Sequence, residues 1–126
     1  MILLDGNTYL EIVTDATTPL DVDVTWVDID STTYTPDHRS TNVAETGSQV
    51  ICETSSGSPA PVRKIKQISI VNTDSTNDVD VYINKEGSPG TFKVSPTFTL
   101  LAKEMVHYID GRGWVYYAAS GIIKTA

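Results

Sequence analysis

Cysteine is the scarcest of the chemically useful residues in this 126-residue chain, which contains only Cys52. A single cysteine excludes an internal disulfide and a metal site built from several thiolates. The chain has two histidines, His38 and His107, and together with one cysteine they are a poor basis for a zinc site. We therefore expect no bound metal and no cofactor.

Long apolar runs are also missing. No stretch approaches the ~18 consecutive apolar residues of a membrane-spanning helix. The N-terminus, MILLDGNTYLE, has no basic segment and reaches Asp5 after a short apolar run, unlike a signal peptide. We expect a protein that is made in a cytoplasm, is not secreted and does not bind a membrane.

Positive charge is sparse and unevenly placed. Nine Lys and Arg residues against sixteen Asp and Glu give a net charge of -7, which argues against binding nucleic acid by neutralising its phosphates. Residues 1–38 carry eight acids and no Lys or Arg, and the densest basic patch is Arg63, Lys64 and Lys66. The acidic part is either a solvated face or a face that meets the basic face of a neighbouring subunit.

Helical periodicity is nearly absent, with residues 100–106, LLAKEMV, as the one short candidate. Elsewhere apolar residues alternate with polar ones, as in LDVDVTWVD (20–28) and DVDVYIN (78–84). Residues 8–14 and 47–54 are rich in the β-branched side chains that strands favour. These segments predict strands.

Four further segments are less regular. In VRKIKQISIVN (62–72), Ile65 and Ile68 fall on opposite parities, which predicts either a bulge or a strand covered on both faces near its end. The turn formers NTDSTND (72–78) predict a hairpin between 62–72 and 78–84. Residues 30–46 contain few apolar groups and predict a long exposed loop, and residues 121–126 predict a C-terminal tail.

About eight short strands without crossover helices indicate an all-β fold with little or no helix. We predict one domain over residues 1–126, an antiparallel β-sandwich of the jelly-roll or immunoglobulin-like kind. Trp26 and one or two C-terminal aromatic residues are expected in its core.

No catalytic constellation emerges from the nucleophiles and bases. Cys52 lies in the middle of an expected strand and is interpreted as a small core residue. His107 alternates with Met105 and Ile109, which predicts a packing role, and His38 lies in a polar segment. The acids at 28, 30, 74, 78 and 80 match no calcium loop, so we assign them to turns and solubility. We expect no catalytic residue and no enzyme.

The second half of the chain resembles a known group of proteins. Its parts are RKIKQISIVNTD, then DVDVYINKEG, then FTLLAKEMVHYIDGRGWVYYAASG. This order is similar to that of small all-β structural proteins of tailed-bacteriophage virions. The stretches that carry the resemblance are Arg63 and residues 68–72, 79–83, 100–106 and 113–121. The chain departs from the pattern at residues 102–104, Ala-Lys-Glu, where a glycine turn is usual.

The resemblance implies a virion protein that decorates the capsid, sits in the head–tail neck or forms part of a fibre. It would act by associating with itself and by docking on capsid or connector proteins. The alternative is a carbohydrate- or receptor-binding module that uses an exposed aromatic side chain. The residues that we expect at a protein interface are Trp114, Tyr116, Tyr117, Ile122, Ile123, Arg63, Lys64 and Lys66. In a strand, Trp114 and Tyr116 face one way and Val115 and Tyr117 the other; we expect the second pair to face a partner.

Overall fold

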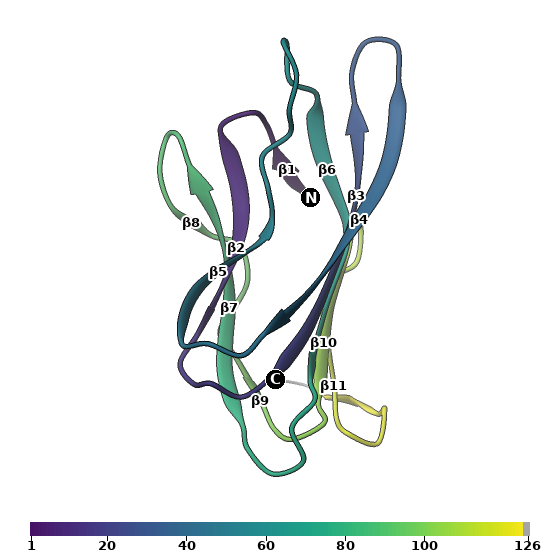
Figure 1. Cartoon of the computed structure of the whole chain (residues 1–126). Coiled ribbons are helices and arrows are strands. Elements are labelled where there is room, and N and C mark those ends of the chain that lie inside the picture. Colours follow the sequence, from purple (N-terminus) through teal and green to yellow (C-terminus); the bar gives the residue numbers. More distant parts are fainter. Residues whose placement is uncertain (125–126) are drawn as a thin grey trace.

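The computed structural model describes residues 1–124, which form twelve strands in two antiparallel sheets that pack face to face (Figure 1). The strands are β1 (Ile2–Leu4), β2 (Thr8–Thr14), β3 (Leu20–Ile29), β4 (Tyr34–Val43), β5 (Gly47–Cys52), β6 (Val62–Asn72), β7 (Val79–Gly87), β8 (Phe92–Lys93), β9 (Phe98–Leu100), β10 (Met105–Ile109), β11 (Gly113–Tyr117) and β12 (Ile123–Lys124). The prediction of an all-β antiparallel sandwich is confirmed, with more strands than the eight or so expected.

The seven-stranded sheet has the order β12-β11-β10-β6-β3-β4, with β1 also paired to β6. The five-stranded sheet has the order β5-β2-β7-β8, with β9 also paired to β7. Strand β3 shows why the sequence folds this way: Leu20, Val22 and Val24 are buried between the sheets, whereas Asp21 and Asp23 face solvent. The described residues contain no helix that could span a membrane.

Strand β6 contains the bulge that its irregular pattern suggested. Its pairing with β3 shifts between Thr25 and Trp26, so that Lys66 is the extra residue between Ile65 and Gln67. The extra residue lets Ile65 and Ile68 both reach the core despite their opposite parities, and both are fully buried. Of the two explanations left open, the bulge is confirmed.

The expected hairpin between residues 62–72 and 78–84 is wrong. Strand β6 belongs to the seven-stranded sheet and β7 to the five-stranded sheet, so the connection crosses from one layer to the other. Asp74 holds this crossing together by accepting hydrogen bonds from the N–H groups of Thr76 and Asn77, 2.8 and 2.9 Å long. The turn residues were recognised, but a turn sequence alone does not say whether the chain returns to the same sheet.

The long exposed loop expected over residues 30–46 is also wrong in part, because Tyr34–Val43 is strand β4. This strand lies at the edge of its sheet and only Val43 is buried, so its composition resembles that of a loop. Residues 100–106 form no helix. A turn separates β9 from β10, and Lys103 occupies a left-handed conformation with φ 65°, at the place where a glycine is usual.

The tail expected over residues 121–126 contains a short strand, since Ile123–Lys124 pairs with β11 as β12. Residues 125–126 lie outside the described part of the chain. The core between the sheets includes Trp26, as predicted, together with Tyr108, while Trp114 and Tyr116 pack against its border.

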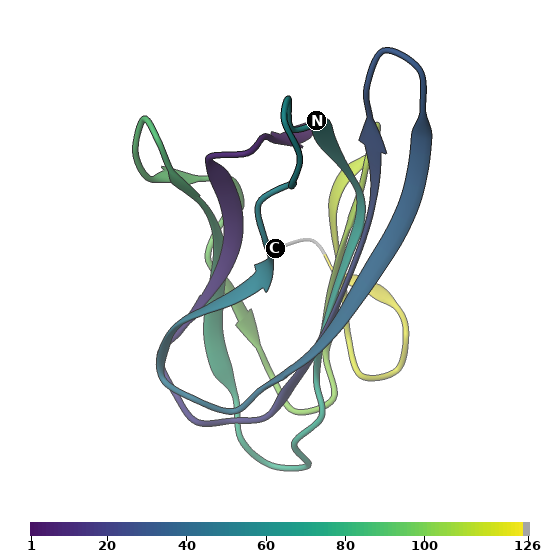
Figure 2. The same cartoon turned by 45° about the horizontal axis from the view of Figure 1, so that its top comes forward.

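The two long sides of the sandwich differ. On one side β4 runs into β5, and the chain passes from one sheet to the other, as Figure 2 shows. An ion pair of 3.1 Å between Arg39 and Glu53 adds to the closure of this side. On the other side, β8 and β9 border one sheet and β11 and β12 the other. We call this second side the open side.

Candidate functional site on the open side of the sandwich

Strand β11 carries the aromatic cluster and divides it between two faces. Trp114 pairs with the buried Tyr108 and Tyr116 with the buried Val106 of β10, so both aromatic side chains point between the sheets. Tyr117 therefore lies on the outer face of the seven-stranded sheet. The structure places Trp114 and Tyr116 between the sheets and Tyr117 on the outer face. That Tyr117 meets a partner protein stays a prediction.

The inward side chains form the floor of a groove between the sheets. The Phe98 ring lies 5.5 Å from Trp114 and 6.0 Å from Tyr116, measured between ring centroids. The Trp114 N–H donates to the carbonyl of Val94 at 3.2 Å, which fixes the indole across the gap between the sheets. This aromatic groove has a volume of about 870 Å³ and is lined by Pro96, Thr97, Phe98, Thr99, Leu101, Arg112, Trp114, Val115, Tyr116, Ile123 and Lys124.

A buried carboxylate closes one end of the aromatic groove. Glu104 accepts hydrogen bonds from the Leu101 N–H at 3.0 Å, from the Tyr116 hydroxyl at 2.6 Å and from the Lys124 ammonium at 2.9 Å. Lys124 also lies 4.5 Å from the centroid of the Tyr116 ring. Burial raises the pKa of Glu104, but these donors outweigh burial and leave its pKa below the usual value. The carboxylate is therefore charged and fully used by its own chain.

The outer face beside Tyr117 is partly apolar. The His107 ring meets Tyr117 edge-on at 5.3 Å, and Met105 and Val115 lie on the same face. Burial lowers the pKa of His107, and its Nε2 is buried with no hydrogen-bond partner among residues 1–124. Ile123 continues this face on β12 and is 56% exposed.

Exposed apolar side chains concentrate on the open side. Residues 1–124 include nine large apolar side chains that are exposed, and five of them line the aromatic groove or the smaller hollow next to it: Met1, Leu3, Phe92, Leu101 and Ile123. Ile122 adjoins Ile123 and is exposed as well. The predicted interface residues Trp114, Tyr116, Ile122 and Ile123 are thus brought together at one side of the molecule.

The predicted basic patch is not part of this site. Arg63 binds both carboxylate oxygens of Asp28, at 2.8 and 2.9 Å, and lies 4.5 Å from the centroid of the Trp26 ring. Lys64 and Lys66 both bind Asp110, at 3.3 and 3.5 Å. These cations are engaged within the chain, which leaves them less available to an acidic neighbour.

Sequence reasoning missed Phe98, Leu101, Glu104, Arg112 and Lys124 as residues of the site. Phe98 comes from the short strand β9, Leu101 directly follows that strand, and Glu104 lies in the turn after it. A signal was present, since Phe98 and Leu100 alternate and leave Leu101 without a place on the buried face. The partnership of Glu104 with Lys124, twenty residues apart, has no local signal.

Comparison with protein-family models, with curated proteins and with solved structures finds no match to this chain. Its function has to be inferred from the site itself.

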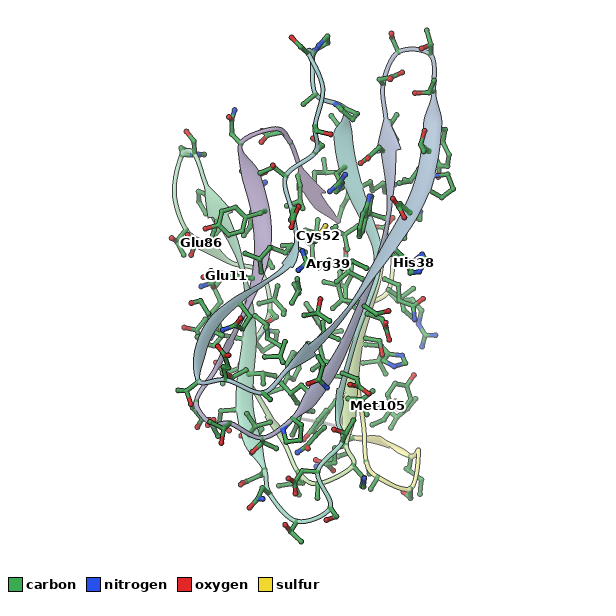
Figure 3. All side chains as sticks on the ribbon, in the orientation of Figure 1. Glu11, His38, Arg39, Cys52, Glu86 and Met105 are labelled. Atoms are coloured by element: carbon green, nitrogen blue, oxygen red, sulfur yellow. The ribbon has the colours of Figure 1, made fainter. Side chains whose placement is uncertain are left out.

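Titratable groups outside the groove have structural explanations. Cys52 is fully buried, and burial raises the pKa of its thiol to about 11. Figure 3 shows Cys52 between the sheets, with Glu11 and Glu86 on the outer side of the five-stranded sheet and His38 and Met105 on the outer side of the other. Burial and the adjacent Glu86 raise the pKa of Glu11. Among the described residues, no group of three His, Cys, Asp or Glu side chains is placed to hold a metal ion.

The groove is suited to bind apolar and aromatic groups. Three of its polar groups already have partners, because the Trp114 N–H, the Tyr116 hydroxyl and the Glu104 carboxylate bond within the chain. What remains available is apolar surface with a cationic border. Such a surface gains free energy when a partner removes it from water.

Proposed function

We propose that this protein is a structural component that works by binding copies of itself and other proteins through its open side. The observation that carries the proposal is the gathering of exposed apolar side chains along the aromatic groove and the adjoining hollow. Apolar surface concentrated in this way is typical of interaction sites, whereas scattered apolar residues need no explanation. Large aromatic side chains at its centre are the residue type that contributes most to protein interfaces.

The particle that we propose is the virion of a tailed bacteriophage, in which the protein would decorate the capsid, join head to tail or belong to a fibre. The support for this step is the resemblance of residues 62–121 to such proteins. One position that belongs to it, Asn72, has a clear structural task, since it ends β6 and bonds to the end of β9. At residues 102–104 the chain departs from the pattern, and Lys103 adopts there the left-handed conformation that a glycine adopts readily.

A carbohydrate- or receptor-binding module is the second candidate, and the aromatic floor of the groove is what favours it. A sugar site needs polar groups that are free to bond hydroxyls beside the aromatic platform. Here the polar groups nearest to Trp114 and Tyr116 are occupied within the chain. The groove is therefore better suited to an apolar protein segment than to a glycan.

Self-association is tested by light scattering coupled to size-exclusion chromatography over a series of concentrations. We expect oligomers that weaken when Leu101→Glu places a charge in the groove, because burying that charge without a partner is costly. The control is Val50→Glu, which changes an equally apolar, exposed position on β5, far from the groove. It should leave association unchanged.

A chain that stays monomeric at every concentration, or two variants that act alike, would contradict the assembly role. Binding of a monomer to sugars on a glycan array, abolished by Trp114→Ala, would support the second candidate instead. The genes beside this one test the virion assignment separately. Capsid, portal or tail genes next to it support a virion protein, and a metabolic operon contradicts one.

A further inference from the structure

Charge is separated between the two sides of this sandwich. Residues 20–46, which contain β3 and β4, carry six acids and one Arg. Residues 92–124, which contain β8 to β12 on the open side, carry four Lys and Arg and two acids. The sheet order places β4 and β12 at opposite edges of the same sheet. One side of the molecule is thus clearly acidic, and the other side carries a smaller excess of positive charge.

The two acids of the basic side are already neutralised. Glu104 is paired with Lys124, and Asp110 is paired with both Lys64 and Lys66. Arg112 lines the aromatic groove and forms no ion pair with any residue of the range 1–124. The groove therefore offers apolar surface with an available cation at its border.

The acidic side ends in a hairpin whose aromatic residue and negative charge are complementary to the aromatic groove and its available cation. Residues 30–38 are all exposed, and Figures 1 and 2 show the β3–β4 hairpin projecting beyond the body of the sandwich. Tyr34 is 65% exposed at its end, and Asp30 and Asp37 flank it. The hairpin thus presents one large aromatic side chain in a stretch that carries two carboxylates and no Lys or Arg. Tyr34 and Asp37 lie on opposite faces of β4.

The hairpin is also held in one conformation before any partner arrives. The Asp30 carboxylate accepts hydrogen bonds of 2.8 Å from the N–H groups of Thr32 and Thr33. These bonds lower the pKa of Asp30 to about 2, so the turn keeps its charge and its hydrogen bonds at neutral pH. A preformed hairpin loses less conformational entropy on binding than a flexible loop.

We propose that the β3–β4 hairpin of one copy docks in the aromatic groove of the next copy, with Tyr34 on the aromatic floor and Asp30 and Asp37 towards Arg112. This inference rests on the self-association in the proposed function and names its geometry. Because the hairpin and the groove are different surfaces, the contact is head-to-tail and repeats from copy to copy. Such contacts build rings when the rotation closes and filaments when it does not.

Two variants test this contact, because each of them removes one of its two surfaces and keeps the other. The hairpin variant combines Tyr34→Ser with Asp37→Asn, and the groove variant combines Leu101→Glu with Arg112→Glu, so that the altered hairpin and the altered groove do not attract each other. All four side chains lie at the surface, and circular dichroism and thermal unfolding verify that both variants fold. Each variant alone keeps one intact half of the contact, so its own association constant should fall about tenfold or more.

The deciding measurement is light scattering on an equimolar mixture of the two variants. An intact hairpin on the groove variant can still enter the intact groove of the hairpin variant. We expect a 1:1 heterodimer that grows no further, because its remaining hairpin and groove are the altered ones. Val50→Glu serves as the control and should form the same oligomers as the unaltered chain.

The other outcomes overturn the inference in distinguishable ways. If the hairpin variant associates as well as the unaltered chain, the hairpin is not the occupant, while self-association stands. If both variants are monomers and their mixture stays monomeric, an intact hairpin and an intact groove do not suffice for association, and the head-to-tail contact is wrong. If the unaltered chain itself never associates, the self-association in the proposed function fails, and this inference fails with it.

Discussion

At the scale of single residues, Asn72 ties the two sheets together. Its side-chain amide is fully buried at the end of β6 and donates to the carbonyls of Asn77, Leu100 and Leu101, at 2.8, 3.0 and 3.1 Å. Its carbonyl oxygen accepts from the Asp74 N–H at 2.9 Å. One side chain thus satisfies backbone groups of the arch between the sheets and of the end of β9.

Replacing Asn72 with Ala should lower the free energy of unfolding by about 3 kcal/mol, because several buried backbone groups lose their partners. Urea titration followed by tryptophan fluorescence measures this change. Thr73→Ala is the control, since its side chain makes one hydrogen bond, to Pro19, and its loss should cost about 1 kcal/mol. Equal effects of the two variants would show that Asn72 is not a special link.

Arg63 is a second cross-link, at the other end of β6. It binds Asp28 through two parallel hydrogen bonds and donates to the Glu53 carbonyl at 2.9 Å, beyond the end of β5. Its guanidinium also lies against the Trp26 ring. The planar fork makes all of these contacts at once, which an ammonium group cannot do.

Arg63→Lys should therefore destabilise the protein by about 1–2 kcal/mol even though the charge is kept. The measurement is the same urea titration, applied to Arg63→Lys, Asp28→Asn and the double variant. We expect the double variant to lose less stability than the sum of the two single ones, because the bonds between these side chains are counted in both. Strict additivity would mean that the two residues stabilise the fold independently.

At the scale of elements, β11 has two faces with different tasks. Trp114 packs at the border of the core, while Tyr117 lies on the outer face against His107. Trp114→Ala should cost about 3 kcal/mol of stability, because it empties part of the core border and frees the Val94 carbonyl. Tyr117→Ala should cost about 1 kcal/mol, which thermal unfolding of both variants will resolve. A larger loss for Tyr117 would mean that the outer face carries more of the fold.

His107, also on the outer face, gives a pH dependence with a defined sign. Its pKa in the folded protein lies below the ordinary value of 6.5, because burial disfavours the charged ring. A depressed histidine pKa means that the unfolded chain binds the proton more tightly. The stability that neutral His107 supports is therefore present above pH 6.5 and is lost as the pH falls through the folded-state pKa.

Urea midpoints at pH 7.5 and 5.5 test this dependence. The midpoint of the unaltered chain should fall between these values, and that of His107→Gln should fall less. The window lies above the ordinary carboxylate range. Glu11, whose pKa is raised, is present in both proteins, so the difference between their two falls belongs to His107. An equal fall in both proteins would assign the effect to other groups.

The comparison of elements also shows what a sequence can predict here. Alternating patterns located β3 and β7, because each buries one face over most of its length and leaves the other in water. The β-branched content of residues 8–14 and 47–54 located β2 and β5. Strand β4 was missed because an exposed edge strand with one buried side chain has no alternation to detect. The β6–β7 connection was misassigned because the turn formers at residues 72–78 fit an arch between sheets as well as a hairpin.

The part of the candidate site that could be predicted consists of residues close together in the sequence. Trp114, Tyr116, Ile122 and Ile123 were found because they cluster in the sequence, and the structure gathers them on one side. The basic patch was expected to face a partner, but its cations meet acids that lie far away in sequence, such as Asp28 and Asp110. Pairing of this kind depends on the fold and leaves no trace in sequence spacing.

At the scale of the whole molecule, one contiguous core joins the two sheets. Twenty buried residues from both layers form a single cluster, and residues 1–124 show no second core that would separate the N-terminal from the C-terminal half. We therefore expect residues 1–124 to unfold in one cooperative step. The surface, in contrast, is divided into an acidic side and an apolar side with a basic border. Two different surfaces of this kind are what the proposed head-to-tail contact needs.

Cys52 offers a measure of this cooperativity, because its thiol is fully buried and its pKa is raised to about 11. Thiol reagents attack the thiolate, so labelling at pH 8 requires an opening that exposes the side chain to water. If the sandwich opens as one unit, the labelling rate should rise with urea as steeply as global unfolding does. Asn72→Ala should then accelerate labelling by the factor that its loss of stability predicts, about 100-fold for 3 kcal/mol. Labelling that is indifferent to urea and to Asn72→Ala would instead show that β5, an edge strand, detaches by itself.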